Sequence, residues 1–200
     1  MSWAELLLEQ SLVYRLWQAP FADQKFAPVI AHNDLAQVRR ALDVGCGPGT
    51  NSRYFRESQY LGIDINPRYV AAARRRYGLE FQAMDARLYR PVAGQRFDFI
   101  LINSFLHHLN SGDVVELLAH VRSLLTEDGY VHILEPEMPA SRSLAYFLAK
   151  ADRGKFVRPL EEWESFFSAS FQPVLLECYP LRAGPFTLWK MLYFKGGPKK

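Results

Sequence analysis

Arg40-Ala41-Leu42-Asp43-Val44-Gly45-Cys46-Gly47-Pro48-Gly49-Thr50 is the stretch that decides the fold of this chain. Residues 40–44 are a short apolar run typical of a buried strand, and the loop after them has glycine at every second position. Thr50 or Asn51 then begins a predicted helix that continues to about Glu57. Because glycine tolerates tight turns and close approach of a ligand, the loop is expected to present backbone amides to a bound molecule. A purely structural turn between strand and helix is the alternative.

The pattern of strand, turn and helix recurs along the chain. Further strands are predicted at residues 60–65, 79–83, 97–102 and 130–134, and helices at 69–77 and 114–125. Strands that alternate with helices in this way favour a parallel sheet. Two late runs, residues 173–179 and 186–194, suit an antiparallel pair at the sheet edge. The expected fold class is α/β: a Rossmann-like doubly wound sheet of seven strands, with an antiparallel C-terminal pair and helices on both faces.

The 200 residues are expected to form a single domain, residues 1–200. Helical patterns at the N-terminus predict a cap over residues 1–35. A second helical region, with helices near residues 141–153 and 160–168, predicts an insert over residues 138–168 that covers the substrate side. The last five residues, 196–200, are predicted to form a frayed tail.

Composition narrows the class of protein. A net charge of +3, with 49% hydrophobic and 22% charged residues, is ordinary for a globular protein. We interpret the arginines at 74–76 as the solvated side of a helix and not as a nucleic-acid surface. Cys46 and Cys178 are far apart, which favours free thiols and a cytoplasmic location. The apolar run at residues 6–8 is too short and too closely flanked by glutamates for export or membrane insertion.

Acidic residues follow the predicted strands where a nucleoside would need them. Asp64 ends the second strand, 15 residues after Gly49, and can accept hydrogen bonds from both hydroxyls of a ribose. Asp85, at the end of the third strand, can accept from an adenine amino group, with Met84 or Ile65 packed on the ring. Three successive strand ends are therefore expected to meet at one nucleoside.

These motifs resemble those of the class I S-adenosylmethionine-dependent methyltransferases of small-molecule type. The matching stretches are residues 42–50, 62–66, 84–86 and 97–109, followed by Leu124-Leu125, Gly129 and Glu135-Pro136. They occur in the family's order between about residues 40 and 136. The resemblance implies S-adenosyl-L-methionine as cofactor and S-adenosyl-L-homocysteine as product. The glycine spacing also differs from the dinucleotide fingerprint, which makes NAD or FAD a poor rival.

The resemblance also implies roles for individual residues. Asp43 would meet the methionine amino group, Asp64 the ribose and Asp85 the adenine, while Asn103 would lie beside the methionine moiety. Tyr14 is expected either to close over the cofactor or to pack in the core. The full set of candidate cofactor-binding residues is Tyr14, Asp43, Gly45, Cys46, Gly47, Gly49, Thr50, Asp64, Ile65, Met84, Asp85, Ala86, Asn103 and Ser104.

Candidate catalytic residues follow the fourth strand. His107 and His108 lie at the rim where an acceptor should bind, and either could act as a general base. A structural role for the pair is the alternative. Adjacent residues on a helix point in different directions, so at most one of the two should face the site. The spacing of the histidines predicts no metal site.

The sequence favours a small-molecule acceptor and O- or N-methylation. Methylases of base nitrogens or glutamine amides usually carry an Asn-Pro-Pro-aromatic element after the fourth strand, whereas here Asn103 is followed by Ser104-Phe105. Cytosine C5 methylases use a Pro-Cys nucleophile, and here neither cysteine follows a proline. A non-catalytic cofactor-binding partner or regulatory protein and a tRNA or rRNA methyltransferase remain as alternatives, and the oligomeric state stays open. The aromatic residues of the insert could cover an acceptor or could be core residues; they are Phe147, Phe156, Trp163, Phe166 and Phe167. The basic residues of the insert could bind an anionic acceptor or could form solvated salt bridges; they are Arg142, Lys150, Arg153, Lys155 and Arg158.

Overall fold

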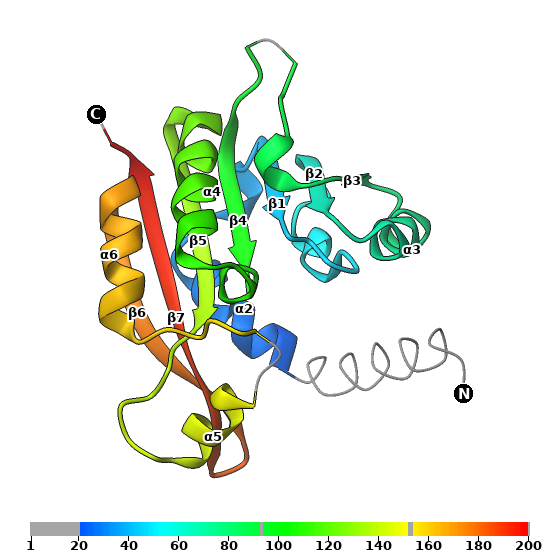
Figure 1. Cartoon of the computed structure of the whole chain (residues 1–200). Coiled ribbons are helices and arrows are strands. Elements are labelled where there is room, and N and C mark those ends of the chain that lie inside the picture. The colour runs from blue at the N-terminus through cyan, green and yellow to red at the C-terminus, as the bar shows by residue number, and fades with distance from the viewer. Residues whose placement is uncertain (1–20, 93, 152–153, 200) are drawn as a thin grey trace.

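All strands of the described chain join one sheet. The computed structural model describes residues 21–92, 94–151 and 154–199. The strands are β1 (Arg40–Val44), β2 (Gln59–Asp64), β3 (Glu80–Ala83), β4 (Phe97–Asn103), β5 (Leu125–Pro136), β6 (Phe171–Ala183) and β7 (Phe186–Pro198). Their order is β3-β2-β1-β4-β5-β7-β6 (Figure 1). Strands β1 to β5 are parallel, and β7 is antiparallel to both β5 and β6. The expected fold class is confirmed, with β7 inserted beside β5 and β6 at the edge.

Helices cover both faces of this sheet (Figure 1). The α-helices are α2 (Ala22–Ala31), α3 (Pro67–Tyr77), α4 (Ser111–Leu124), α5 (Leu144–Lys150) and α6 (Leu160–Ser170). Short 3-10 turns are η2 (Leu35–Gln37), η3 (Thr50–Tyr54), η4 (Ala86–Leu88) and η5 (Leu106–His108). Helix α3 begins two residues before the predicted 69–77, because Asn66 caps it by accepting from the Arg68 amide and Pro67 takes the first helical position. Among the described helices, none has the length and apolar character needed to cross a membrane.

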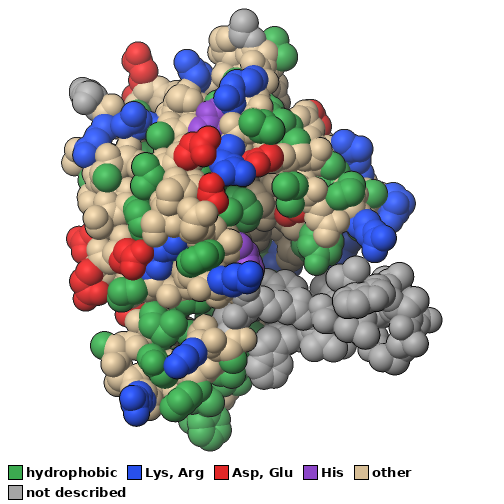
Figure 2. Space-filling model, viewed as in Figure 1, with side chains coloured by type: hydrophobic (Ala, Val, Ile, Leu, Met, Phe, Trp, Pro, Cys, Tyr) green, Lys and Arg blue, Asp and Glu red, His purple; other side chains and the backbone are tan. Residues whose placement is uncertain are grey.

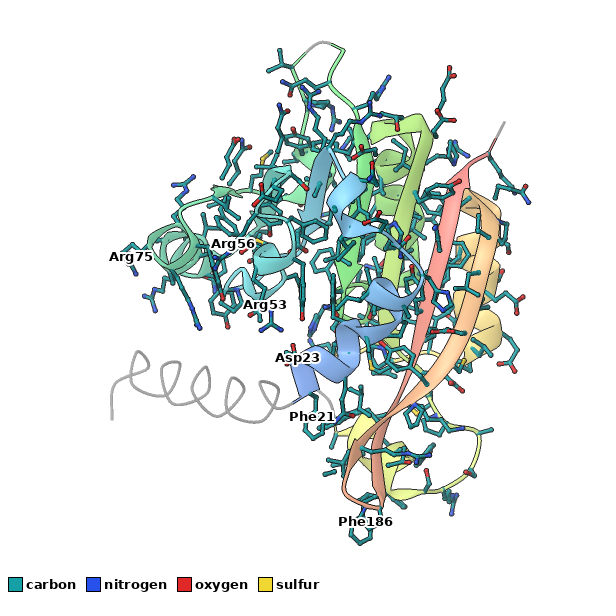
Figure 3. All side chains as sticks on the ribbon, turned by 180° about the vertical axis from the view of Figure 1, so that it is seen from behind. Phe21, Asp23, Arg53, Arg56, Arg75 and Phe186 are labelled. Carbon is teal, nitrogen blue, oxygen red and sulfur yellow. The ribbon has the colours of Figure 1, made fainter. Side chains whose placement is uncertain are left out.

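The β6–β7 hairpin projects beyond the carboxyl ends of β4 and β5. Its outer part packs with α5, and a small core of Phe21, Leu181, Trp189 and Met191 lies between them. Hydrophobic side chains gather on the surface of this projecting unit (Figure 2). Phe186 stands at its tip and is 62% exposed (Figure 3). The unit therefore extends from the same sheet edge at which the carboxyl ends of the parallel strands meet.

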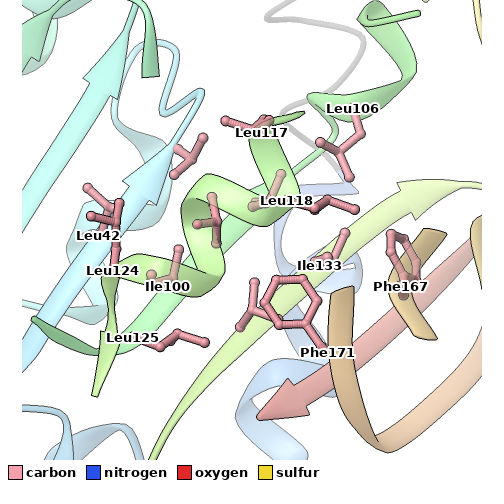
Figure 4. Packing of buried hydrophobic residues seen from close by; sticks show 14 of the residues in the cluster. Leu42, Ile100, Leu106, Leu117, Leu118, Leu124, Leu125, Ile133, Phe167 and Phe171 are labelled. Carbon is pink, nitrogen blue, oxygen red and sulfur yellow. The ribbon is translucent and has the colours of Figure 1, made fainter. Parts of the chain in front are cut away.

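Two larger cores lie on opposite faces of the sheet. Alternation of side chains along β4 sends Ile100 and Ile102 to one core and Phe99 and Leu101 to the other. The first core is covered by α4 and α6, whose Leu117, Leu118 and Phe167 pack over the sheet (Figure 4). The second is covered by α2 and α3, through residues such as Phe26, Val29 and Val70. Burial on both faces explains why the central strands are apolar throughout.

Two predicted local structures are wrong. The helix expected over residues 50–57 is only the five-residue 3-10 turn η3, because Gly49 enters it in a left-handed conformation and Thr50-Asn51-Ser52 are weak helix formers. The tail expected to fray from Gly196 instead continues β7 to Pro198, which pairs with Phe171. Gly196 permits this pairing because a Cβ there would lie 2.6 Å from the Phe194 ring.

Candidate cofactor and active site

The glycine loop follows β1 and is held against the end of β2. The amides of Gly45 and Cys46 donate to the Ile63 carbonyl at 2.8 and 3.0 Å. Gly45, Gly47 and Gly49 all have positive φ, at 71°, 53° and 78°. A Cβ at Gly45 would meet the Phe105 ring at 2.6 Å, whereas none of the described atoms lies within 4 Å of a Cβ at Gly47. Packing therefore requires glycine at position 45, and the loop has open space at position 47.

Asp64 connects the second strand to this loop. Its Oδ2 accepts from the Gly47 amide at 2.9 Å, and its Oδ1 accepts from the Asn66 amide at 2.8 Å. The structure thus brings the glycine and acidic motifs into direct contact. A carboxylate has about four lone-pair positions, so Asp64 can hold the loop and still accept from a ligand hydroxyl. Next to it, Ile65 is 71% exposed and can cover a flat ligand.

Asp43 is a buried carboxylate with one oxygen unsatisfied. Its side chain is almost fully buried, and Oδ2 accepts from the Tyr60 hydroxyl at 2.9 Å. Its Oδ1 is also buried and has no hydrogen-bond partner among the described residues. Burial raises the pKa of Asp43 to about 7, against the opposing effects of the Tyr60 hydroxyl and the nearby Asn51 side chain. A buried, unsatisfied carboxylate oxygen fits a cationic ligand group such as an ammonium.

Asp85 is fixed at the end of β3 by Arg87. The guanidinium lies 2.8 Å from Oδ2, and the Arg87 amide donates to Oδ1 at 2.9 Å. These hydrogen bonds hold the pKa of Asp85 below its usual value. Arg87 also pairs with Asp113 on α4 at 2.6 Å, which anchors this strand end to the helix. Met84 and Ala86, on either side of Asp85, are partly buried against the first core.

Asn103 and Ser104 end β4 on the other side of the loop. Asn103 Nδ2 donates to Asn51 Oδ1 at 3.4 Å, and the Ser104 hydroxyl donates to Asn103 Oδ1 at 3.2 Å. Ser104 also accepts from the Lys25 ammonium at 3.0 Å. Lys25 was missed by sequence reasoning. The sequence does carry a signal for it, because Lys25 precedes Val29 by four residues and so lies on the buried face of α2.

His107 is held in a structural position. It is 4% exposed, and its Nδ1 lies 2.6 Å from Glu135 Oε2, while Glu135 Oε1 accepts from the amides of Phe105 and Leu106. Glu135 thereby organises the turn after β4, a role not expected from its place in the fifth-strand motif. His108 is exposed, and its ring lies 4.2 Å from that of His107.

The insert covers His107. The Phe156 amide donates to the His107 carbonyl at 3.0 Å, and a Cβ at Gly154 would collide with the His107 ring. Trp163 and Phe167 are fully buried, so the core interpretation is right for these two aromatics. Phe147 and Phe156 are 57% and 38% exposed.

Arg158 forms the expected salt bridge, with its Nε 2.9 Å from Glu162 Oε1, but its side chain is buried and not solvated. It is 4% exposed, lies over the Trp163 ring at 4.9 Å and donates to the Leu109 carbonyl at 2.8 Å. This arginine ties the insert to the turn after β4, because three aromatic rings and the carbonyls of Phe156 and Leu109 surround its guanidinium. Arg153 and Tyr14 lie outside the described residues. Within the described ranges, no three His, Cys, Asp or Glu side chains are grouped to hold a metal.

Comparisons with known proteins find methyltransferases. Residues 41–129 match a family described as a methyltransferase domain. The chain is 31% identical over 138 residues to trans-aconitate 2-methyltransferase of Escherichia coli K12, an alignment that covers 64% of this chain and 53% of the relative. The enzyme of the same name from Shigella dysenteriae is 30% identical over 149 residues, with 68% and 58% covered. The chain therefore spans only a little over half the length of these curated relatives.

Solved structures share the fold. N-methyltransferase NodS from Bradyrhizobium japonicum superposes with a TM-score of 0.71 at 15% identity, covering 90% of this chain and 98% of that one. The 1,6-didemethyltoxoflavin-N1-methyltransferase of Burkholderia thailandensis gives a TM-score of 0.70 at 21% identity, with 98% and 89% covered. Residues 41–129 therefore form a methyltransferase domain of the class I S-adenosylmethionine-dependent kind, whose cofactor is S-adenosyl-L-methionine.

Proposed function

We propose that this protein transfers the methyl group of S-adenosylmethionine to an oxygen or nitrogen atom of a small molecule. The observation that carries the proposal is the buried, unsatisfied Oδ1 of Asp43 beside the glycine loop. The cofactor's methionine ammonium would satisfy this oxygen and favour the charged carboxylate. Asp64, which is hydrogen-bonded to the same loop, supports the assignment because it stands one strand away and can take the ribose.

The remaining contacts are proposed by the same logic. Asp85 would accept from the adenine amine, Ile65 and Met84 would pack on the ring, and Asn103 would lie beside the methionine moiety. Loop backbone would follow the cofactor from Gly45 to Thr50. The other proposed contact residues are Cys46, Gly47, Gly49, Ala86, Ser104 and Tyr14.

The chain contributes mainly position and shelter to the reaction. Bound S-adenosylmethionine supplies an electrophilic methyl group on a sulfonium, which an acceptor must attack in line. Fixing both reactants and excluding water provide most of the rate in such a transfer. The exposed rings of Phe147 and Phe156 in the insert are proposed to shelter the acceptor side. For an acceptor that must lose a proton, we propose His108 as base, because His107 is committed to Glu135.

The relatives suggest which acceptors to try first. Trans-aconitate is named for two of them, and a toxoflavin precursor for one structural neighbour. A nucleic-acid acceptor is not proposed, since Arg74, in the arginine run of α3, donates to the Phe81 carbonyl. Cys46 and Cys178 are free, in line with a location in the reducing cytoplasm.

A labelled-cofactor assay tests this function. The protein is incubated with methyl-labelled S-adenosylmethionine and acceptor pools that include trans-aconitate, and release of S-adenosylhomocysteine is measured. Turnover that falls in Asp64→Ala when S-adenosylmethionine is not saturating is the expected result. Tight cofactor binding without turnover in any pool would point instead to a non-catalytic, cofactor-binding regulatory protein.

A further inference from the structure

Lys25 is a buried cation at the carboxyl end of β4. The residue is 8% exposed, and its Nζ lies 3.0 Å from Ser104 Oγ. Burial of an ammonium is costly unless hydrogen bonds and a nearby negative charge compensate for the lost hydration. Ser104 directly follows Asn103. Lys25 therefore places a positive charge next to the proposed methionine end of the cofactor site.

Ser104 has an unusual backbone for a residue other than glycine. Its φ of 54° is left-handed, and it is alone among the described non-glycine residues in having a positive φ. The conformation is enforced by neighbours: the Ser104 amide donates to the Leu134 carbonyl at 2.7 Å, and the Phe105 amide donates to Glu135. Backbone strain maintained in this way is typical of functional sites. Here it directs the serine hydroxyl toward Lys25.

A chain of hydrogen bonds runs from Lys25 toward Asp43. Lys25 donates to Ser104, whose hydroxyl donates to Asn103 Oδ1, and Asn103 Nδ2 donates to Asn51 Oδ1. Asn51 in turn lies close enough to Asp43 to favour its charged form. This series of hydrogen bonds therefore has a cationic side chain at one end and a carboxylate at the other. That arrangement complements a ligand that carries both an ammonium and a carboxylate.

Helix α2 holds Lys25 firmly in place. Asp23 points toward Arg53 of η3 and forms an ion pair with it (Figure 3). Phe26 stacks on Tyr54 of η3, with 4.2 Å between the ring centroids. The Tyr179 hydroxyl of β6 donates to the Lys25 carbonyl at 2.7 Å. The ammonium is thus preorganised by contacts to the glycine-loop side and to the hairpin.

We infer that Lys25 and Ser104 form a carboxylate-binding subsite at the methyl-transfer end of the cofactor site. The inference rests on the proposed function. The carboxylate is either that of the cofactor's methionine or one on the acceptor, and both would receive a charge-assisted hydrogen bond from Lys25. A neutral replacement of the lysine side chain should weaken whichever carboxylate ligand occupies the subsite.

Calorimetry on the full chain separates the two sources. If the subsite takes the cofactor's carboxylate, Lys25→Met weakens S-adenosylhomocysteine about tenfold or more and leaves 5′-methylthioadenosine, which has no carboxylate, unchanged. If it takes an acceptor, S-adenosylhomocysteine is unchanged, and trans-aconitate binds the loaded protein about tenfold more weakly. Lys25→Arg, which keeps the charge, should retain most of the affinity.

Two further variants keep the test decisive. Lys199→Met removes an exposed lysine at the far edge of the sheet and should change neither affinity. If Lys25→Met does not fold, Ser104→Gly replaces it, because glycine suits the left-handed backbone and removes the hydroxyl. If the wild type binds S-adenosylhomocysteine but Lys25→Met changes neither this affinity nor the affinity for trans-aconitate, the subsite is overturned and the proposed function is not. Failure of the wild type to bind S-adenosylhomocysteine overturns the proposed function as well.

Discussion

Asp43 and Asp64 end neighbouring strands in different electrostatic surroundings. Asp64 is only partly buried and accepts from two backbone amides, whereas Asp43 is enclosed and has one oxygen that no described residue hydrogen-bonds. Desolvation disfavours the charged form of Asp43, and the negative charge of Asp64 adds to this effect. The two carboxylates are therefore expected to respond differently to pH and to substitution.

Cofactor affinity should depend on pH through Asp43. The pKa of Asp43 is about 7 in the folded protein and 3.8 in the unfolded chain. Between these two values the ligand-free folded protein keeps the proton that the unfolded chain releases, so the protein loses stability as pH rises through this window. A bound ammonium needs the carboxylate, so affinity should rise with pH. We expect S-adenosylhomocysteine to bind roughly tenfold more tightly at pH 8 than at pH 6.

Asp43→Asn provides the control for this pH dependence. The amide cannot ionise, so the variant should bind the same ligand weakly and with nearly equal affinity at both pH values. Calorimetric titrations of the two proteins make the comparison. A wild-type affinity that stays flat between pH 6 and pH 8 would contradict the role given to Asp43.

Asp64 is expected to matter for both the ligand and the loop. Asp64→Ala should weaken S-adenosylmethionine binding by roughly 1.5–3 kcal/mol, the usual cost of losing a charged hydrogen-bonding group. Asp64→Asn keeps one acceptor and should lose less. Unchanged calorimetric affinity in Asp64→Ala would refute the ribose assignment.

At the scale of elements, the glycine loop combines structural and binding requirements. Gly49 is left-handed, and a Cβ there would lie 2.8 Å from the Phe81 ring and 2.9 Å from Ala73. Gly47 is also left-handed, but a Cβ there would have no described atom within 4 Å. Packing therefore accounts for glycine at position 49, whereas at position 47 we propose that a bound ligand requires it.

Alanine substitutions separate these two requirements. Gly49→Ala combines left-handed strain with overpacking and should lower the free energy of unfolding by roughly 2–5 kcal/mol. Gly47→Ala carries the strain alone, at about 1–2 kcal/mol. Urea denaturation of both variants measures the difference, and equal losses would show that packing around position 49 relaxes easily.

At the scale of the whole molecule, α6 joins the insert to the main core. Phe167 is fully buried between Trp163 and Phe194 of β7, with ring centroids 5.7 and 4.8 Å away. Phe167→Ala should therefore destabilise the protein by about 3–5 kcal/mol. Phe186→Ala, at the exposed hairpin tip, is the matched control and should change stability by about 0.5 kcal/mol or less. Thermal and urea unfolding both test this, and similar losses in the two variants would contradict the assigned core.

Most of the sheet could be predicted because its signals are local. Apolar runs, glycine turns and caps such as Asn66 act over a few residues, so strands β1 to β5 and helix α3 were located well. Errors arose where distant residues decide the outcome. Gly196 stays paired because Val131 of β5 and Pro173 of β6 lie on either side of it, and η3 stays short because Gly49 fixes its entry.

The sequence by itself determined where the candidate site lies, since parallel strands bring Asp43, Asp64 and Asp85 to one sheet edge whatever covers them. Only the tertiary structure decided which other side chains reach that edge. Lys25 contacts Ser104 across 79 residues, and Glu135 contacts His107 across 28. Such contacts depend on how helices and loops pack over the sheet, and local patterns carry no record of that packing.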